Sequence, residues 1–335
     1  MTTTAATAPR LAAVTGASGH VGANLVRVLL AQGQQVRALA RRTRQAIDDL
    51  PVEIAEGDVL DQRSLEHAFA GVDTVFHLAA KLAVGGEAAA PIHEVNVEGT
   101  RNVVAACRAV GVRRLVHMSS IQALARPPGK GMVDESCPLV QPGSAGGAYD
   151  LAKAEAERIV LAAGSGLDAV ILQPTAVLGP FDFRPSPMGA VLAALAHGRM
   201  PALLAGAECD FVDVRDVADT AIAAAERGRP GERYLLSGTR LSLRELAHRW
   251  ASVTGRPAPR WAAPMWLARL AAPFTPSWAR LRGQRPLFTS EALRVLRGFP
   301  AIDRRKAEHE LAYQPRPIDE TLRDTWAWMS QRGQA

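Results

Sequence analysis

Cysteine is scarce in this sequence, and a long uninterrupted apolar run is missing from it. The 335 residues include three cysteines, Cys107, Cys137 and Cys209, which lie far apart without metal-binding or redox spacing. Isolated cysteines argue against structural disulfides or a zinc site and suit a reducing cytoplasm. No stretch approaches the ~18 consecutive apolar residues of a membrane span, and the start lacks the basic residues and apolar core of a signal peptide. We therefore expect a cytoplasmic protein with a flexible tail over residues 1–10 and no metal.

The overall composition of the chain is typical of a soluble globular enzyme. Apolar residues make up 48% of the chain and charged residues 21%, which is enough to bury a large core. The net charge of +6 is modest, and no nucleic-acid-binding motif accompanies it. We therefore expect no nucleic acid partner.

Short apolar runs alternate with helical apolar spacing through the first half of the chain. Strands are expected at 11–15, 36–39, 52–55, 74–78, 114–118 and 168–172, and helices near 23–32, 63–70, 99–110 and 149–163. This alternation predicts an α/β fold with a doubly wound parallel sheet of the Rossmann type. We expect an NAD(P)-binding Rossmann domain at 11–178 and a mainly substrate-binding domain at 179–335, with segments returning to the Rossmann body.

A glycine-rich turn joins the first expected strand to the first expected helix. Its sequence is Gly16-Ala17-Ser18-Gly19-His20-Val21-Gly22, with Gly-x-x-Gly-x-x-Gly spacing. Glycines at such a turn let backbone N–H groups approach a pyrophosphate at a helix N-terminus, where the helix dipole favours negative charge. The spacing is a weak signal alone, but the order of strand, turn and helix strengthens it.

Tyr149 and Lys153 stand four residues apart on an expected helix. This spacing puts the phenol and the ammonium on one face, about one turn apart. We expect the positive charge to lower the pKa of the phenol toward the working range of a general acid. Reduction of a carbonyl needs such an acid, while a nicotinamide supplies the hydride.

These motifs, in this order, resemble those of the extended short-chain dehydrogenase/reductases, also called the NAD-dependent epimerase/dehydratase family. The resemblance covers about residues 10–330. Within the family, the sequence looks more like the dihydroflavonol reductase, cinnamoyl reductase and 3β-hydroxysteroid dehydrogenase branch than like the sugar enzymes. Besides the glycine turn and the Tyr/Lys pair, it rests on Gly57-Asp58-Val59, His77-Leu78-Ala79-Ala80, Asn96-Val97-Glu98-Gly99-Thr100, Ser119-Ser120, the run 173–180 and the run 211–218.

The resemblance implies a role for each matching residue. Ser120 would bind the substrate oxygen, with Ser119 the less favoured candidate, and Tyr149 would act as acid in reduction and base in oxidation. Lys153 would hold the nicotinamide ribose. Asp58 would meet the adenine. The cofactor-binding set it implies is Gly16, Ser18, Gly19, His20, Val21, Gly22, Asp58, Val59, Ala79, Ala80, Lys81, Tyr149, Lys153, Pro174, Thr175 and Val177.

Three polar residues within the motifs have simpler structural interpretations. Asn96 precedes an expected helix and is read as an N-cap or loop anchor. His77 and His117 fall within apolar strand patterns, so we interpret them as packed core histidines rather than bases.

The end of the second expected strand bears on the choice of cofactor. Folds of this type that prefer NAD place a carboxylate there for the ribose hydroxyls. Here the position falls at or near Ala40, and Arg41, Arg42 and Arg44 follow. Because guanidinium groups suit the additional phosphate of NADP, we predict NADP(H) over NAD(H), with Arg41 leading and Arg42 or Arg44 assisting. A solvated basic loop is the alternative.

This sequence departs from the patterns of the family's sugar enzymes, which argues against a dehydratase or a nucleotide-sugar epimerase. Dehydratases carry Thr-Asp-Glu where this chain has Ser120-Ile121-Gln122. Nucleotide-sugar epimerases usually have Asn and Arg where this chain has Gln173 and Cys209, and loss of that arginine removes a partner for a diphosphate. A hopanoid-associated group of sugar epimerases resembles this sequence in overall pattern, so these departures do not exclude every epimerase of the family.

The substrate side of the sequence is mainly apolar. Candidate pocket residues are Lys81–Gly86, Phe181, Phe183, Met188, Leu192 and Phe211, although each could equally belong to the core. Residues 256–306 are rich in arginine and contain Trp261, Trp266 and Trp278, with a short amphipathic stretch at 265–270. We expect these tryptophans to pack within the substrate domain, in preference to a surface that touches anionic lipid or an acidic partner. Prolines at 264, 273 and 276 argue against a spanning helix.

The sequence therefore predicts an NADPH-dependent carbonyl reductase or alcohol dehydrogenase acting on a small apolar molecule. Two alternatives stay open: a sugar epimerase that holds NAD, and a non-catalytic NADP-binding sensor. Many members of the family dimerise through helices that include the Tyr/Lys helix, so the resemblance leaves a homodimer open.

Overall fold

The computed structural model describes residues 10–333, with the exception of positions 42–43, 84–87, 128, 130, 145, 201, 273–292, 295, 297 and 300. Residues 1–9 of the expected tail, Arg42, residues 84–86 of the 81–86 stretch and Trp278 lie outside the described residues. Within the described ranges, no helix combines the length and apolar character needed to cross a membrane.

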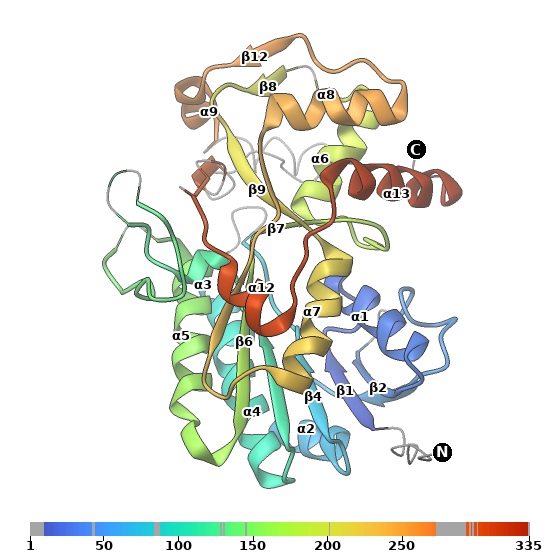
Figure 1. Ribbon diagram of the computed structural model, residues 1–335, viewed down its shortest axis with the longest axis vertical. Coiled ribbons are helices and arrows are strands. Elements are labelled where there is room, and N and C mark those ends of the chain that lie inside the picture. The colour runs from blue at the N-terminus through green and yellow to red at the C-terminus, as the bar shows by residue number, and fades with distance from the viewer. Residues whose placement is uncertain are drawn as a thin grey trace.

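Seven parallel strands of the described chain form the central sheet, in the order β10-β6-β5-β4-β1-β2-β3 (Figure 1). The strands are β1 (Leu11–Thr15), β2 (Gln35–Ala40), β3 (Glu53–Glu56), β4 (Thr74–His77), β5 (Arg114–Met118), β6 (Asp168–Pro174) and β10 (Arg233–Leu236). The strand order reverses between β1 and β4, and in such sheets ligands bind beyond the carboxyl ends of the strands at this switch point.

Helices cover both faces of this sheet (Figure 1). One face carries α1 (His20–Ala31) and α7 (Val214–Arg227), which pack together through Leu25, Val26 and the alanine-rich side of α7. The other face carries α2 (Gln62–Phe69), α4 (Gly99–Ala109) and α5 (Ala148–Ala162). Because both faces are buried, the inner strands β1, β4, β5 and β6 read as mainly apolar runs, whereas the edge strand β3 has an exposed glutamate at each end.

The fold predicted from the sequence is confirmed. The strands from β1 to β6 and the helices α1, α2, α4 and α5 lie within a few residues of their expected bounds. The sequence pattern missed α3 (Ala89–His93) and the π-helical turn η1 (Glu94–Glu98), which lead directly into α4. Neither segment is long enough to show a helical period of its own.

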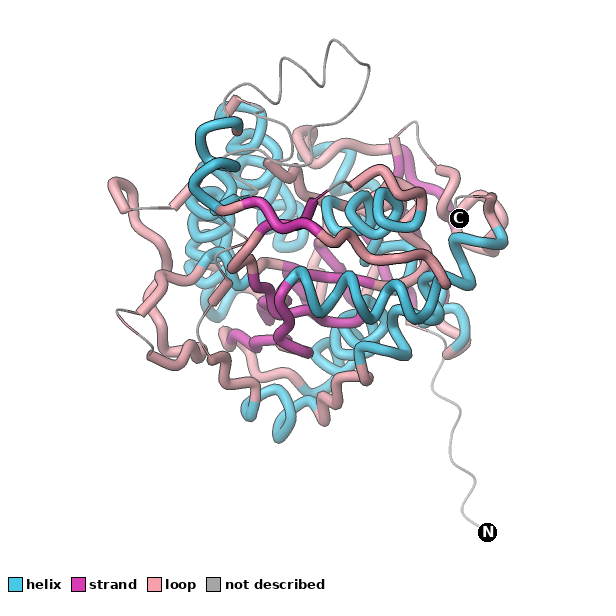
Figure 2. The backbone as a smooth tube through the Cα atoms, turned by 90° about the horizontal axis from the view of Figure 1, so that it is seen from above, coloured by secondary structure: helices cyan, strands magenta, loops and turns pink. Residues whose placement is uncertain are grey.

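The later part of the chain builds a second, smaller layer above the carboxyl end of the sheet (Figures 1 and 2). Its strands are β7 (Ala176–Leu178), β9 (Glu208–Asp213) and β11 (Thr239–Ser242) in one sheet, and β8 (Ala202–Leu204) paired with β12 (Trp261–Ala263). Its helices are α6 (Pro187–Ala196), α8 (Leu243–Thr254), α9 (Met265–Ala271) and α13 (Ile318–Gln331); α12 (Arg305–Leu311) contacts β10 and α7. A separate core, centred on Trp250, Phe211 and Leu322, holds this layer together.

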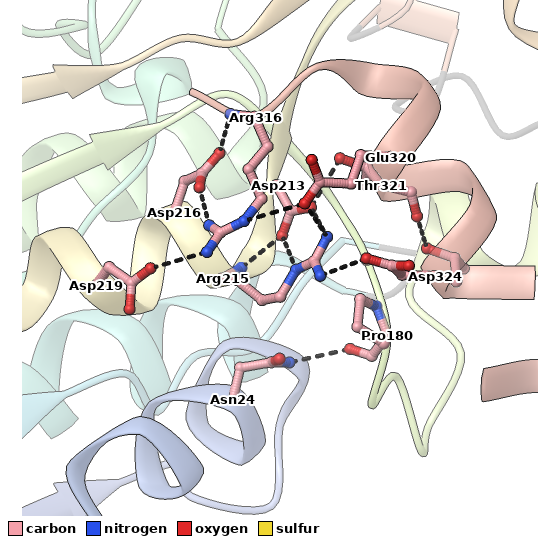
Figure 3. Close-up of polar contacts among 12 residues, drawn as sticks. Asn24, Pro180, Asp213, Arg215, Asp216, Asp219, Arg316, Glu320, Thr321 and Asp324 are labelled. Carbon is pink, nitrogen blue, oxygen red and sulfur yellow. Dashed lines mark hydrogen bonds and ion pairs between the residues drawn. The ribbon is translucent and has the colours of Figure 1, made fainter. Parts of the chain in front are cut away.

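A network of ion pairs connects the smaller layer to helix α7, which covers the central sheet (Figure 3). Asp213, at the end of β9, is fully buried and caps α7 by accepting a hydrogen bond from Arg215 N at 2.7 Å. Its carboxylate also pairs with the Arg215 guanidinium and accepts a hydrogen bond from Thr321 on α13. Burial works to raise the pKa of Asp213, but these hydrogen bonds outweigh it and hold that pKa below its ordinary value. Arg215 extends the network to Asp324 on α13.

The expectation that the tryptophans at 261 and 266 pack inside the small layer is wrong. Trp261 is 78% exposed and Trp266 is 62% exposed. In the seven-residue helix α9, Met265 and Ala268 take the inward positions against the core, which leaves Trp266 on the outside. A helix that is apolar on nearly all sides cannot bury every side chain against one neighbour.

We expect Asp213→Ala to lower the free energy of unfolding by about 3 kcal/mol, because it removes a helix cap and leaves Arg215 without its buried partner. Asp219→Ala serves as the matched control, since Asp219 is exposed and its pair with Arg316 contributes less than about 1 kcal/mol. Urea unfolding followed by circular dichroism measures both. Equal losses in the two variants would contradict a structural role for the network.

Candidate active site

The glycine turn brings β1, α1 and β4 into close contact. Gly16 has a φ of +71°, and a Cβ atom at this position would lie 2.7 Å from the backbone nitrogen of Ala79. A Cβ at Gly22 would clash with the Gly16 carbonyl oxygen. Glycine is therefore required at both places, since another residue would push α1 away from the sheet.

The N-terminus of α1 is suited to a phosphate group. Its N-cap is Gly19, which offers no side-chain hydrogen bond to the first N–H groups of the helix. These groups and the helix dipole favour an anion, as in other dinucleotide-binding turns. The residues present therefore fit the pyrophosphate of a nicotinamide dinucleotide. His20, the first residue of α1, contacts the loop that follows β7. Its Nε2 lies 3.1 Å from the carbonyl oxygens of both Gly179 and Pro180.

A cavity of about 460 Å³ runs from this turn into the small layer. It unites most of the residues that the sequence proposes for the site. Those in its wall are Gly16, Gly19, His20, Val21, Gly22, Ala80, Ser120, Tyr149, Lys153, Pro174, Thr175 and Val177. Ser18, Arg41, Asp58, Val59, Ala79 and Lys81 lie outside that wall.

Ser120, Tyr149 and Lys153 meet at the carboxyl end of β5. Tyr149 and Lys153 lie one turn apart on α5. Lys153 Nζ donates a hydrogen bond to the Met118 carbonyl oxygen at 2.8 Å. Ser120 follows β5 and its Oγ accepts a hydrogen bond from the backbone of Gln122, at 3.2 Å, in the 3₁₀ turn η2 (Ile121–Ala123).

Burial governs the ionisation of both α5 side chains. It raises the pKa of Tyr149 well above its ordinary value, and a hydrogen bond with Ser120 offsets only part of that rise. It also lowers the pKa of Lys153 to about 8, although the charge of Glu157 opposes this shift. The net pKa of Tyr149 is therefore raised, where the sequence led us to expect it lowered, since desolvation of the phenol dominates. The phenol stays protonated at neutral pH, which is the form that can donate a proton.

Glu157 is a fully buried carboxyl group one turn beyond Lys153. It accepts hydrogen bonds from Ser119 Oγ and from Gln173 Nε2, the latter at 2.9 and 3.0 Å to its two oxygens. Burial raises the pKa of Glu157. The sequence marked Gln173 only as a departure from the epimerase pattern and did not point to Glu157. The signal that could have identified Glu157 is its spacing of four residues from Lys153, which places both side chains on one face of the helix.

The two histidines and Asn96 have the structural positions expected of them. His77 and His117 are each 1% exposed, and burial lowers the pKa of His77 to about 3. His77 hydrogen-bonds Thr15 at 2.8 Å. Asn96 anchors the loop after β4, because its side chain bonds both the N–H and the carbonyl of Lys81. The interpretation of these three residues as core or loop anchors is confirmed.

The arginines after β2 face carboxylates near β3. Arg41 Nη1 lies 2.9 Å from Asp58 Oδ2, and Arg44 pairs with Glu56 at 2.7 Å. The Arg41 side chain is 71% exposed, so this pair holds it only weakly. Asp58 Oδ1 also accepts from the Leu60 N–H, and Val59 packs against Gly99.

Several apolar residues predicted for the pocket instead belong to the core. Phe181 and Phe183 pack with Trp328, while Leu192 and Phe211 are each 1% exposed in the small-layer core. Met188 does line the cavity, as do Leu82 and Ala83 from the 81–86 stretch. The remaining apolar wall, which sequence reasoning missed, is formed by Val191, Leu195, Met200, Leu203, Leu204, Leu243, Leu246, Leu296, Phe299 and Ile302.

Comparison with known proteins agrees with this geometry. The model of the NAD dependent epimerase/dehydratase family matches residues 12–237. A Methylococcus capsulatus protein named sterol demethylase protein B is 39% identical, over 96% of this chain and 98% of that protein. A Stigmatella aurantiaca protein named 4-hydroxy-2-methyl-3-oxo-4-farnesyl-3,4-dihydroquinoline-1-oxide ketoreductase is 33% identical, over 90% and 91%. The crystal structure of gox2253 has a TM-score of 0.83 and 34% identity, over 97% and 99%.

The family match covers more than half of the chain and includes the glycine turn, the Tyr/Lys pair and the sheet through β10. Other relatives bear the names dihydroflavonol reductase and 3β-hydroxysteroid dehydrogenase, as the resemblance in sequence predicts. The chain therefore belongs to the NAD-dependent epimerase/dehydratase family, and is an NAD(P)-dependent oxidoreductase of the extended short-chain dehydrogenase/reductase type.

Proposed function

We propose that this protein reduces a ketone or aldehyde of a largely apolar small molecule with NADPH, or oxidises the corresponding alcohol. The observation that carries the proposal is a single cavity with Ser120, Tyr149 and Lys153 at its polar end and aliphatic side chains along the rest. Its volume of about 460 Å³ falls within the range of small-molecule sites.

Each polar side chain at this end has a distinct task in the proposed reaction. Tyr149 donates its phenolic proton to the substrate oxygen, and Ser120 holds that oxygen by a hydrogen bond. When bound beside these residues, a nicotinamide would supply the hydride. Lys153, charged below about pH 8, stabilises the phenolate left on Tyr149 and binds the nicotinamide ribose. Thr175 borders the same end of the cavity with a buried hydroxyl that has no partner among the described residues, so it can bond the cofactor.

The wall of the cavity favours an apolar substrate over a nucleotide sugar. Among its described lining residues there is no arginine, and Lys153 is already bonded to the Met118 carbonyl. A diphosphate would therefore meet no guanidinium group there. The names of the two relatives above refer to a sterol and to a farnesylated quinoline, which are bulky apolar molecules. The epimerase alternative is correspondingly weaker.

A role as a cofactor-binding sensor is also disfavoured. A protein that only binds the dinucleotide gains nothing from burying an ammonium group and a phenol at the substrate end. Burying both groups costs free energy. That cost is reflected in the pKa values of Tyr149 and Lys153, which desolvation raises and lowers, respectively.

NADPH is the proposed cofactor because of the arginines after β2. No carboxylate stands at the end of β2, where Ala40 is followed by Arg41. Arg41 would have to leave Asp58 to contact the 2′-phosphate, and breaking this exposed pair would cost less than about 1 kcal/mol. A charge-assisted contact with phosphate is worth more than that.

We expect Tyr149→Phe to lower kcat for carbonyl reduction by about 10²- to 10⁴-fold while cofactor binding persists, because it removes the proton donor alone. The measurement is NADPH oxidation against a panel of apolar aldehydes and ketones, with cofactor binding followed by fluorescence. Tyr313→Phe is the control, since Tyr313 is buried but hydrogen-bonds Ser237 away from the cavity. If wild-type protein binds NADPH and consumes none with any carbonyl, nucleotide sugars become the next substrates to try.

We expect Glu157→Gln to move the alkaline limb of the pH–rate profile to lower pH. The pKa of Lys153 is about 8, and the negative charge of Glu157 raises it, so a neutral amide allows the ammonium to lose its proton sooner. Reduction should then decline at a lower pH than in the wild type. Glu155→Gln, a half-exposed change on the same helix, should leave the limb in place. An unchanged profile in Glu157→Gln would mean that this carboxyl does not act on Lys153.

We expect Arg41→Ala to raise KM for NADPH by roughly tenfold and to leave KM for NADH almost unchanged, because the lost contact is to the 2′-phosphate alone. Initial rates with each cofactor measure the effect. Arg63→Ala, an exposed arginine on α2, controls for the loss of surface charge. An unchanged KM for NADPH would remove Arg41 from the cofactor site.

A further inference from the structure

Four large apolar side chains project into solvent from one short segment of the small layer. Trp261 in β12 is 78% exposed, and Trp266, Leu267 and Leu270 in α9 are 62%, 47% and 63% exposed. We call these four residues the β12–α9 surface. It lies at the top of Figure 1, at the opposite end of the molecule from α2 and α4.

Packing among the described residues does not account for this surface. Met265 and Ala268 already provide the contacts of α9 with the small-layer core. Single exposed apolar residues are ordinary, but two tryptophans and two leucines within ten residues form a cluster of the kind that marks an interaction site.

The excess positive charge of the sequence falls within the same stretch of the chain. Residues 251–290 contain six arginines and neither aspartate nor glutamate, whereas the whole chain has 39 basic and 33 acidic residues. The net charge of +6 is therefore equal to the charge of this segment, and the rest of the sequence is balanced. Arg256 and Arg260 are exposed beside β12, and no acidic side chain among the described residues pairs with them.

The β12–α9 surface is also close to the apolar cavity. Strand β12 pairs in parallel with β8, so that Ala262 lies opposite Leu203 and Ala263 opposite Leu204. Leu203 and Leu204 line the cavity. The exposed tryptophans therefore stand on the strand and helix next to the wall that would contact an apolar substrate.

We propose that the β12–α9 surface docks on an anionic lipid bilayer. Its tryptophans and leucines enter the boundary between headgroups and acyl chains, where indole rings are favoured. The adjacent Arg256 and Arg260 lie over anionic headgroups, each attracted by the surface potential. This combination of exposed aliphatic and indole side chains with unpaired cations matches a membrane interface better than an acidic protein, which would leave the leucines in water. The inference does not depend on the reaction proposed above.

Co-sedimentation of the full-length protein with vesicles tests this proposal. We expect binding to vesicles of phosphatidylcholine mixed with phosphatidylglycerol, and much weaker binding to phosphatidylcholine alone. Trp266→Ser/Leu270→Ser should weaken the binding at least about 10-fold. Arg256→Gln/Arg260→Gln should weaken it roughly 20-fold, and high salt should reproduce that loss.

Met132→Ser is the matched control, because Met132 is 51% exposed and lies outside this surface. Circular dichroism establishes that each variant is folded. Absence of binding to both kinds of vesicle would overturn the proposal, and so would equal binding by Met132→Ser and Trp266→Ser/Leu270→Ser. Sedimentation velocity without lipid provides a further test: self-association that Trp266→Ser/Leu270→Ser abolishes would make this face an interface between copies of the chain and would also overturn it.

Discussion

The contact between the glycine turn and the end of β4 is the constraint on which the site depends. Gly16 lies so close to the backbone of Ala79 that no side chain fits between them. This contact fixes where α1 begins, and thereby aims the first N–H groups of α1 at the switch point of the sheet. The carboxyl ends of β4, β5 and β6 then lie around the same point, which brings Ser120 and α5 to the cofactor cradle.

Burial of ionisable groups gives this site its chemical character. Lys153 and Glu157 occupy successive turns of α5, and each loses water contacts that its neighbours only partly replace. The Met118 carbonyl accepts one hydrogen bond from the ammonium, while Ser119 and Gln173 donate hydrogen bonds to the carboxyl. The result is a polar line beneath Tyr149 in an otherwise apolar cavity, in which each charge influences the next more strongly than it would in water.

Sequence reasoning succeeded where a local pattern decides the structure. The buried strands β1, β4, β5 and β6 read as mainly apolar runs, and the glycine turn has a spacing that geometry demands. It failed for the apolar wall, because Leu203, Leu296 and Phe299 come from short segments without a periodic signal. Composition leaves Phe181 open between pocket and core, and only its packing on Trp328 from α13, which is distant in sequence, places it in the core. The exposure of Trp266 was likewise unreadable, since it depends on which face of α9 meets the core.

The position of β10 at the edge of the central sheet has a consequence for synthesis of the chain on the ribosome. Strand β6 ends at Pro174, but its outer neighbour β10 comes only after Gly231, once the residues between them have emerged. Until then β6 is an uncovered apolar edge, which is the kind of strand that pairs with other chains. Ribosome-bound chains that end between these two strands therefore carry an aggregation hazard that the finished molecule lacks.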